Sequence, residues 1–300
     1  MNRLAASAID AFLHKHDLPD AFRDVIEGHY LPLARWVYGT RAPPRSPIIG
    51  INGAQGTGKS TLADFLRLTL EAEYGWTVAA LSLDDFYLTR AQRDALGEAV
   101  HPLLRTRGAP GTHDLALCTR CLTQLRSLGI GEALALPRFD KAQDDRAPAH
   151  AWPRITGPVD VIILEGWCVG SRPQDPSTLA RPVNALEATR DPDASWRTYV
   201  NEQLRAGYSD VFGLIDRLVF LRAPDFEAVH RWRLEQEAKL ARAAGASSRG
   251  VMDETQIAAF IQHYERLTRA NLSEMPVIAD VTMELDRQHR VTRTRYRLRG

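Results

Sequence analysis

The sequence predicts an α/β fold, a three-layer α/β/α sandwich in which helices cover both faces of a mostly parallel central sheet. Four mostly apolar runs are typical of parallel strands buried on both faces: residues 48–51, 77–83, 159–164 and 215–221. Helical apolar spacing follows the first and the last of these runs. Glycines or acids stand directly after the first three strands, where ligands bind in sheets of this kind.

The composition is that of an ordinary globular protein, with 300 residues, 44% hydrophobic residues, 25% charged residues and a net charge of +1. We expect an amino-terminal helical extension over residues 1–45 and one domain over residues 46–300. The sequence has no excess of basic residues, so we expect no nucleic acid as a partner. It has no apolar run long enough to cross a membrane, so we expect no membrane association. Three cysteines and an amino terminus without a secretory signal favour a cytoplasmic location. The sequence leaves the oligomeric state open.

The amino-terminal residues 4–38 show helical apolar spacing, and we expect the helix to break around Pro19 and Pro32. Residues 42–47, A-P-P-R-S-P, predict a stiff connector to the main fold.

The first apolar strand leads into G-x-x-x-x-G-K-S, and a helical pattern follows this motif. Its glycines permit positive φ angles, so that several backbone N–H groups can surround a phosphate. Lys59 would bridge the terminal phosphates of a nucleotide and Ser60 would ligate Mg²⁺. A glycine-rich turn without a ligand is the alternative. The expected nucleotide contacts are Gly53, Ala54, Gln55, Gly56, Thr57, Gly58, Lys59, Ser60 and Thr61.

Acids follow two of the later strands. Asp84 and Asp85 end the run at 77–83, where a carboxylate could accept the proton of a hydroxyl that attacks the γ-phosphate. These acids could equally form a turn that caps a short helix. Glu165 ends the run at 159–164, a position from which an acid can hold a magnesium-linked water.

Two loops carry further polar residues. Residues 97–114 form a long loop with Arg105 and His113, although His113 and Asp114 could simply cap the next helix. Residues 133–139 resemble another strand, and the polar run that follows could be a solvated loop. Alternatively, Arg138 and Lys141 hold an anionic substrate.

Cys118 and Cys121 form a C-x-x-C pair within a predicted helix over residues 113–128. No second C-x-x-C completes a zinc site, so we interpret both as residues of the core.

The remaining chain alternates between helices and strands. Residues 171–193 form a proline-rich excursion, and residues 196–204 are helical. A long charged helix after the strand at 215–221 is either a solvated face or a helical lid, in which Arg231 or a neighbouring arginine reaches the phosphates. A helix over residues 253–271 precedes a terminal hairpin of residues 281–285 and 291–296.

Five motifs together resemble those of a known kinase group: G-A-Q-G-T-G-K-S (53–60), L-S-L-D-D-F-Y (81–87), R-G-A-P-G-T-H-D (107–114), L-P-R-F-D-K (136–141) and L-E-G-W (164–167). The chain resembles the phosphoribulokinase, uridine kinase and pantothenate kinase superfamily, and within it the plant and fungal-type D-glycerate 3-kinases and their uncharacterised relatives. The likeness includes V-M-D-E at residues 251–254 but not the segment 171–193.

This resemblance implies a P-loop NTPase fold that uses ATP and Mg²⁺ to phosphorylate a hydroxyl of a small metabolite, with D-glycerate as the leading acceptor. Asp84 falls at the catalytic aspartate of the family, and Glu165 at its magnesium-site or second acid. Lys59 completes the predicted catalytic set. The predicted acceptor contacts are Tyr87, Arg105, His113, Asp114, Arg138 and Lys141.

Other classes remain as alternatives. The acceptor could be a nucleoside, a pantothenate-like compound or a sugar phosphate, and the protein could bind ATP without catalysis. A GTPase switch lacks its guanine-reading N-K-x-D, and a transporter ATPase lacks its L-S-G-G-Q signature.

Overall fold

The structure is a computed structural model that describes residues 4–41, 45–244 and 254–297. The first half of the predicted connector at residues 42–47 lies outside these ranges, as does most of the motif at residues 251–254.

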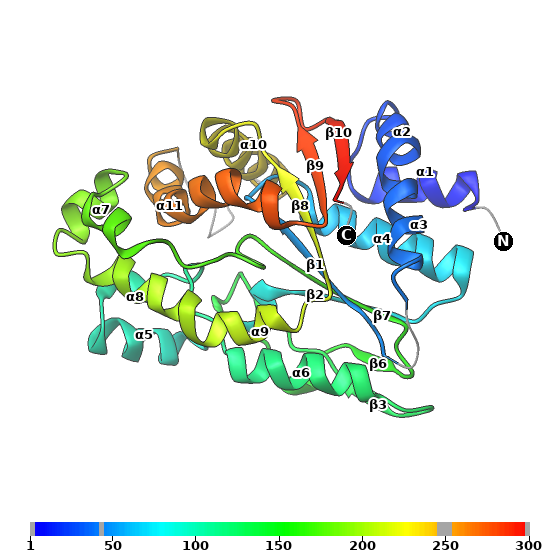
Figure 1. Ribbon diagram of the computed structural model, residues 1–300, viewed down its shortest axis with the longest axis horizontal. Helices are drawn as coiled ribbons and strands as arrows, with labels where there is room; N and C mark the ends of the chain where they lie inside the picture. Colours follow the sequence, from blue (N-terminus) through cyan, green and yellow to red (C-terminus); the bar gives the residue numbers. More distant parts are fainter. Residues whose placement is uncertain (1–3, 42–44, 245–253, 298–300) are drawn as a thin grey trace.

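Six strands form the central sheet in the order β10-β9-β8-β1-β7-β2 (Figure 1). Neighbouring strands run parallel except β9 and β10, which form an antiparallel hairpin at one edge. The mostly parallel sheet and the terminal hairpin predicted from the sequence are therefore confirmed. The strand bounds are β1 Ile48–Gly53, β2 Val78–Ser82, β7 Val161–Gly166, β8 Arg217–Arg222, β9 Val281–Leu285 and β10 Val291–Tyr296.

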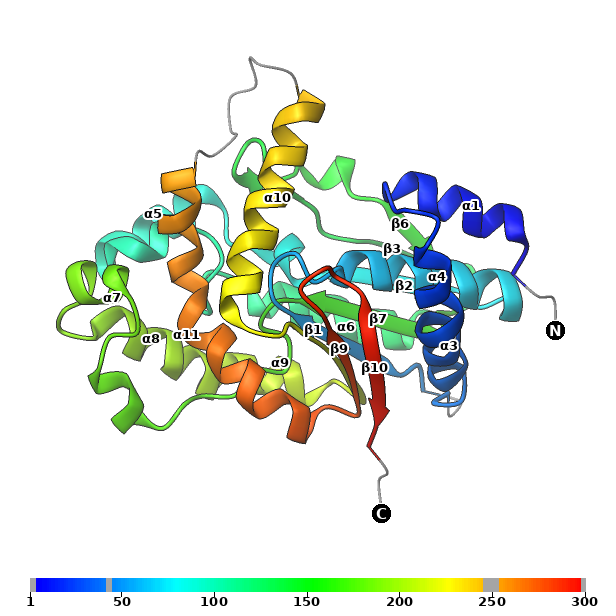
Figure 2. The same cartoon turned by 90° about the horizontal axis from the view of Figure 1, so that it is seen from above.

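Two hydrophobic clusters cover the two faces of this sheet, as the alternation of side chains along a strand requires. One contains Ile49 and Ile51 of β1 with apolar residues of the amino-terminal helices, α4 and α10. The other contains Ile48 with residues of α6, α9 and α11. Figure 2 looks onto one face of the sheet, with α10 and α3 in front of it and α6 behind it. The arrangement is the predicted three-layer sandwich.

The helices form the two outer layers of the sandwich and connect its strands. The larger ones are α4 Lys59–Tyr74, α5 Arg90–Ala99, α6 Leu115–Ser127, α8 Ser195–Gln203, α10 Phe226–Ala244 and α11 Glu254–Ile278. The shorter α-helices are α7 Ala185–Arg190 and α9 Ser209–Gly213, and a π-helical turn, Leu204–Tyr208, joins α8 to α9. Short 3₁₀ turns occupy Leu83–Phe86, Pro102–Arg105, Ala149–Ala151 and Pro176–Ala180. Helix α6 buries Cys118 and Cys121, which confirms that they belong to the core.

The amino-terminal helices are α1 Ala6–Lys15, α2 Phe22–Val25 and α3 Leu31–Tyr38, with a π-helical turn over Ile26–Tyr30. The predicted break at Pro19 is present between α1 and α2. The break expected at Pro32 is wrong, because the chain stays helical through this residue. Pro32 directly follows the π-helical turn, in which the Leu31 N–H donates to the carbonyl of Ile26, and this local change of pairing accommodates the proline. These helices share the hydrophobic cluster of α4, and a domain boundary at residue 45 remains a prediction.

The expected strand over residues 133–139 is also wrong in extent. Residues 133–135 form a strand, β3 (Ala133–Ala135), that pairs with β6, Arg154–Thr156, apart from the central sheet, and the pairing stops before Pro137. Proline 137 has no N–H to donate to a ladder. The chain resumes pairing at β4, Phe139–Asp140, against β5, Asp145–Arg146.

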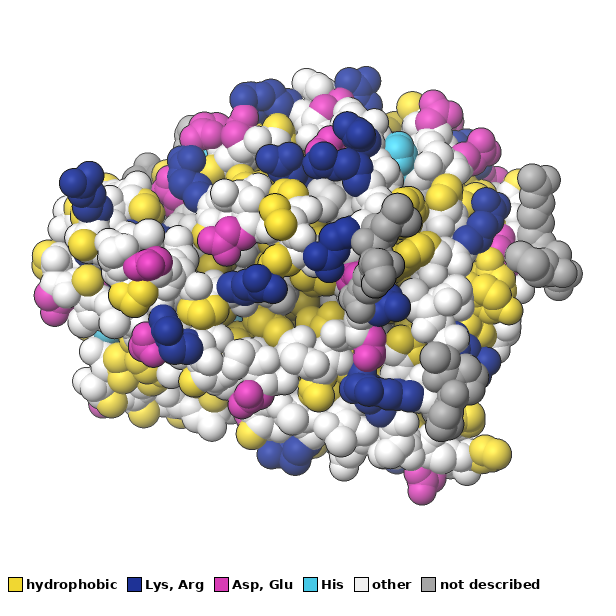
Figure 3. Space-filling view, viewed as in Figure 1, with side chains coloured by type: hydrophobic (Ala, Val, Ile, Leu, Met, Phe, Trp, Pro, Cys, Tyr) yellow, Lys and Arg dark blue, Asp and Glu magenta, His cyan; other side chains and the backbone are white. Residues whose placement is uncertain are grey.

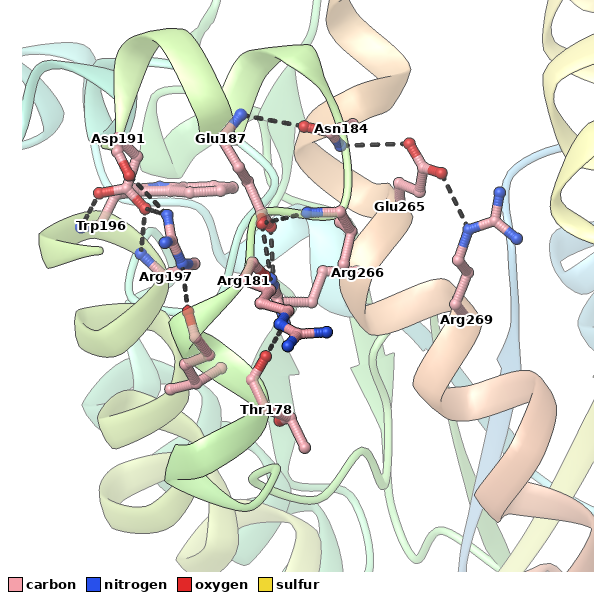
Figure 4. A network of polar contacts seen from close by, with 12 residues as sticks. Thr178, Arg181, Asn184, Glu187, Asp191, Trp196, Arg197, Glu265, Arg266 and Arg269 are labelled. Atoms are coloured by element: carbon pink, nitrogen blue, oxygen red, sulfur yellow. Dashed lines mark hydrogen bonds and ion pairs between the residues drawn. The ribbon is translucent and has the colours of Figure 1, made fainter. Parts of the chain in front are cut away.

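Buried ion pairs hold the excursion at residues 171–193 against α8 and α11 (Figure 4). Asp191 accepts a hydrogen bond from Arg197 Nη1 at 2.9 Å, and both side chains are buried. Arg266 of α11 donates to the buried carboxylate of Glu187 through Nε and Nη2, at 2.8 and 2.7 Å. The segment that matched no motif therefore has a defined place in the fold.

Charged side chains of both signs are interspersed on the face shown in Figure 3. Within the part of the chain that the structure describes, no helix combines the length and apolar character needed to cross a bilayer.

Candidate active site

The glycine-rich motif forms a loop between β1 and the first turn of α4, which begins at Lys59. Gly56 and Gly58 adopt φ angles of 78° and 84°, as expected for a loop that turns its N–H groups inward. Gly53 is not among the residues with a positive φ. Gly53 is required for space, because a Cβ would lie 2.6 Å from Thr57 Oγ1.

Three donors converge on one carbonyl inside this loop. The backbone N–H and the hydroxyl of Thr57 lie 3.3 and 2.8 Å from the carbonyl oxygen of Ala54, and Lys59 Nζ lies 3.1 Å from it. Burial lowers the pKa of Lys59, although nearby Glu165 and Asp84 oppose this effect. Donors that gather on a weak acceptor are available to a phosphate, whose negative charge makes it a stronger one.

Glu165 lies beside Ser60 at the entrance to α4. It is the penultimate residue of β7, in register with Ile51 of β1 and Ser82 of β2. Its Oε1 accepts a hydrogen bond from Ser60 Oγ at 2.8 Å. Burial raises the pKa of Glu165, and the charge of Lys59 opposes this rise.

The hydroxyl of Ser60 and the carboxylate of Glu165 fit a magnesium site. Mg²⁺ prefers oxygen ligands and is commonly held by one or two protein groups together with waters and substrate phosphates. Among the described residues there is no cluster of three or more His, Cys, Asp or Glu side chains that could hold a metal by itself. A metal at this pair would therefore take its remaining ligands from the nucleotide and water.

Asp84 lies in the 3₁₀ turn that follows β2, and both of its carboxylate oxygens are engaged. Oδ1 accepts from the Tyr87 hydroxyl at 3.0 Å, and Oδ2 accepts from Lys141 Nζ at 2.7 Å. Burial would raise the pKa of Asp84, but Lys141 and other nearby positive groups outweigh it and lower the pKa. Asp84 is thus held as an ionised carboxylate.

The neighbouring acid has a different partner. Asp85 accepts from Arg138 Nη1 at 2.8 Å and from the backbone N–H of Phe139 at 3.2 Å. Burial raises the pKa of Asp85, and Arg138 opposes the rise. The two cations predicted to hold an anion therefore each pair with one of the two adjacent acids.

His113 lies against this group. Its ring stacks on Tyr87 with centroids 4.4 Å apart, and its Nδ1 lies 2.5 Å from the Tyr208 hydroxyl. Burial lowers the pKa of His113 to about 4, so that the ring is neutral near pH 7. Its Nε2 is buried and has no hydrogen-bond partner among the described residues.

The structure does not bring every predicted site residue to this place. Asp114 caps α6 by accepting from the N–H of Leu117 at 2.9 Å, and it also pairs with Arg146. The capping alternative is therefore confirmed for Asp114. Arg105 pairs with Glu98 of α5 at 3.5 Å, away from the two strand-end acids.

Several of the other predicted site residues line a common groove. A groove of about 650 Å³ runs past the ends of β2 and β7, and its lining includes Ser60, Asp84, Arg138, Lys141 and Glu165. Arg231 is exposed on α10, one residue before a tryptophan that contacts the phosphate loop.

Three residues near the site were missed by the sequence analysis. Tyr208 holds His113, and Trp232 and His289 contact Gly56 from α10 and the terminal hairpin. No local motif marks them, because each meets its partner across a long stretch of sequence.

Comparisons with known proteins agree with this site, although no family model matches the chain. An uncharacterised kinase of Schizosaccharomyces pombe is 36% identical over 226 residues, a match that covers 72% of this chain and 78% of that protein. The chloroplastic D-glycerate 3-kinase of Arabidopsis thaliana is 34% identical over 237 residues. That match covers 75% of this chain and 47% of the plant protein, so it spans about half the plant enzyme.

Among solved structures, the D-glycerate 3-kinase of Cryptococcus neoformans superposes with a TM-score of 0.73 and 26% identity. The superposition covers 93% of this chain and 100% of the fungal chain. Sequence identity over most of a curated kinase, together with a shared fold and phosphate loop, shows the family. The chain belongs to the P-loop kinases of the phosphoribulokinase, uridine kinase and pantothenate kinase superfamily.

Proposed function

We propose that the protein transfers the γ-phosphoryl group of ATP to a hydroxyl of a small acid, with D-glycerate as the leading acceptor. One observation carries the proposal: the ionised carboxylate of Asp84 and the Ser60–Glu165 pair line the same groove beside the phosphate loop. The relatives named as D-glycerate 3-kinases support the choice of acceptor.

The phosphate loop would bind the nucleotide through the backbone of residues 53–61 and the ammonium of Lys59. Ser60 and Glu165 would hold Mg²⁺, which when bound neutralises part of the charge on the phosphates. The exposed Arg231 is our candidate for the lid arginine.

Asp84 would act as the general base. The acceptor oxygen attacks the γ-phosphorus, the bond to the bridging oxygen of ADP breaks, and the hydroxyl proton moves to Asp84. Each oxygen of Asp84 accepts one hydrogen bond in the free protein, from Tyr87 or from Lys141, and keeps a second lone pair that can accept the hydroxyl.

The acceptor carboxylate would meet the cations that now face the two acids. We assign acceptor contacts to Lys141, Arg138, Tyr87 and the free Nε2 of His113. Arg105 is not assigned, because its side chain pairs with Glu98 outside the groove. Asp114 is not assigned either, since it caps α6.

The test is a panel of acceptors incubated with ATP and Mg²⁺: D-glycerate, a nucleoside, pantothenate and a sugar phosphate. We expect a phosphorylated product from D-glycerate. A product from another member would move the assignment to that acceptor, and ATP binding without any product would support the non-catalytic alternative.

Two pairs of variants sharpen the test. Asp84→Asn should keep ATP affinity and lose turnover by about 10²- to 10⁴-fold, the usual scale for a general base. Asp85→Asn should instead raise the KM for the acceptor, because Asp85 positions Arg138. Arg138→Ala should likewise raise that KM, whereas Arg105→Ala should not. Unchanged turnover in Asp84→Asn would remove Asp84 from its role.

A further inference from the structure

The turn of the terminal hairpin reaches back to the phosphate loop. His289 lies in the turn between β9 and β10, and its Nδ1 is 3.1 Å from the carbonyl oxygen of Gly56. Its ring also packs on the ring of Trp232, with centroids 4.2 Å apart and planes at 32°. The last two strands of the chain therefore touch its first functional motif.

The direction of this hydrogen bond follows from its partner. A carbonyl oxygen only accepts, so Nδ1 must carry the hydrogen and donate it to Gly56. The other ring nitrogen, Nε2, lies 3.4 Å from Glu235 Oε2 on α10. Because a carboxylate oxygen also only accepts, the Glu235 contact is a hydrogen bond only when Nε2 carries a hydrogen as well. The bond to Gly56 and the packing on Trp232 orient the ring in either case.

The backbone of the turn presents His289 in an uncommon conformation, with φ of 62°. Asp286 holds this turn: its Oδ1 accepts from the N–H groups of Gln288 and Arg290 at 2.8 and 3.0 Å. The backbone N–H of Asp286 also donates to the carbonyl of Arg290 at 2.9 Å. Hydrogen bonds within the turn therefore hold the backbone of His289, in addition to its contact with the phosphate loop.

Trp232 completes the contact from α10. It is 1% exposed, and its Nε1 donates to the carbonyl of Arg287 in the same turn at 3.2 Å. A Cβ added to Gly56 would lie 2.7 Å from Trp232 Cβ, so the tryptophan packs directly on the loop. The loop is bounded there by α10 and the hairpin together.

The contact orients a peptide group that faces the nucleotide site. In a trans peptide the carbonyl and the following N–H point in opposite directions. When the Gly56 carbonyl points outward to His289, the N–H of Thr57 points into the loop, where it lies 3.3 Å from the Ala54 carbonyl. That N–H is one of the donors expected to meet a phosphate.

We propose that His289 is a positioning residue for nucleotide binding, which holds the Gly56–Thr57 peptide so that its N–H faces the phosphates. The inference rests on the proposed use of ATP and on no particular acceptor. Loss of the His289 donor should weaken the binding of any nucleotide that carries phosphates in the loop.

Calorimetric titration of the full-length protein with ATP, ADP and adenosine tests this. Glycine and asparagine both tolerate a positive φ, but only asparagine carries a donor near the position of Nδ1. We expect His289→Gly to weaken ATP and ADP roughly 2- to 10-fold, the scale of one hydrogen bond, and to leave adenosine unchanged. His289→Asn should restore most of the affinity, and Gln288→Ala, in the same turn, should bind as wild type.

Several results would overturn the inference. These are unchanged ATP affinity in His289→Gly, an equal loss for adenosine, or no recovery with asparagine. Should the glycine variant not fold, His289→Asp takes its place beside His289→Asn, because both side chains tolerate a positive φ and only asparagine donates. In turnover assays the loss should appear in the KM for ATP, with kcat and the KM for the acceptor retained.

The two proposals fail separately. A wild-type protein that does not bind ATP would overturn both. A wild-type protein that binds ATP but phosphorylates no acceptor would overturn only the proposed reaction.

Discussion

Replacing Asp191 with alanine should destabilise the protein by about 3 kcal/mol, because the change leaves the charge of Arg197 buried without a counter-ion. The exposed fractions of the two side chains are 0% and 2%, so water cannot take the place of the lost carboxylate. Removing one partner of such a buried pair costs about 3–5 kcal/mol in general.

The lower end of that range applies here. Arg197 keeps two other acceptors, the carbonyl oxygens of Leu179 and Asp191, at 2.6 and 2.5 Å. Against this, the backbone N–H groups of Trp196 and Arg197 lose their acceptors on the Asp191 carboxylate. With about 2.1 cal/mol/K of unfolding entropy per residue, 3 kcal/mol corresponds to a fall in Tm of about 5 °C.

Urea unfolding and thermal scans measure both quantities. Asp193→Ala is the matched control, since Asp193 is exposed, lies two residues away and should cost less than about 1 kcal/mol. The double variant Asp191→Leu with Arg197→Met should recover much of the loss, because it leaves no unpaired charge. The reasoning is refuted if Asp191→Ala unfolds within 1 kcal/mol of wild type, or if the double variant is less stable than the single one.

Three further predictions concern the site. In the wild type, Asp84 stays ionised until the pH falls through its lowered pKa. Lys141→Met removes the strongest of the groups that oppose burial, so the acid limb of the kcat/KM profile should move to higher pH, and an unmoved limb would contradict this. Glu165→Gln should raise the Mg²⁺ concentration for half-maximal rate roughly 10- to 100-fold in a metal titration, and an unchanged requirement would exclude the metal role. Gly56→Ala should weaken ATP binding about tenfold or more because of its φ of 78° and the adjacent α10 tryptophan, whereas Gly213→Ala, with no atom within 4 Å of the added Cβ, should bind as wild type in the same titration.

Local signals predicted much of the fold and the centre of the site. Strands β1, β2 and β7 are mostly apolar up to their last residues because helices cover both faces of the sheet, so their runs were recognisable in the sequence. Parallel strands end at a common edge, and this placed Asp84 and Glu165 together.

Other features depended on contacts that the sequence does not reveal. Arg105 lies in the same loop as His113 of the site, yet its side chain forms an ion pair with Glu98. Pro32 resembles a helix breaker in the sequence, but the π-helical turn directly before it lets the helix continue. His289 and Gly56 are 233 residues apart, and neither neighbourhood hints at the other.

The strand order of the sheet also constrains when the protein can fold during its synthesis. β1 pairs on one side with β7, residues 161–166, and on the other with β8, residues 217–222. Because both partners follow β1 by more than 100 residues, β1 is synthesised long before either partner is available to pair with it. Non-local pairings of this kind form slowly and leave apolar strands exposed while they wait. A ribosome-bound chain that stops before β8 therefore carries the whole glycine motif, yet its first strand still lacks one of its two partners.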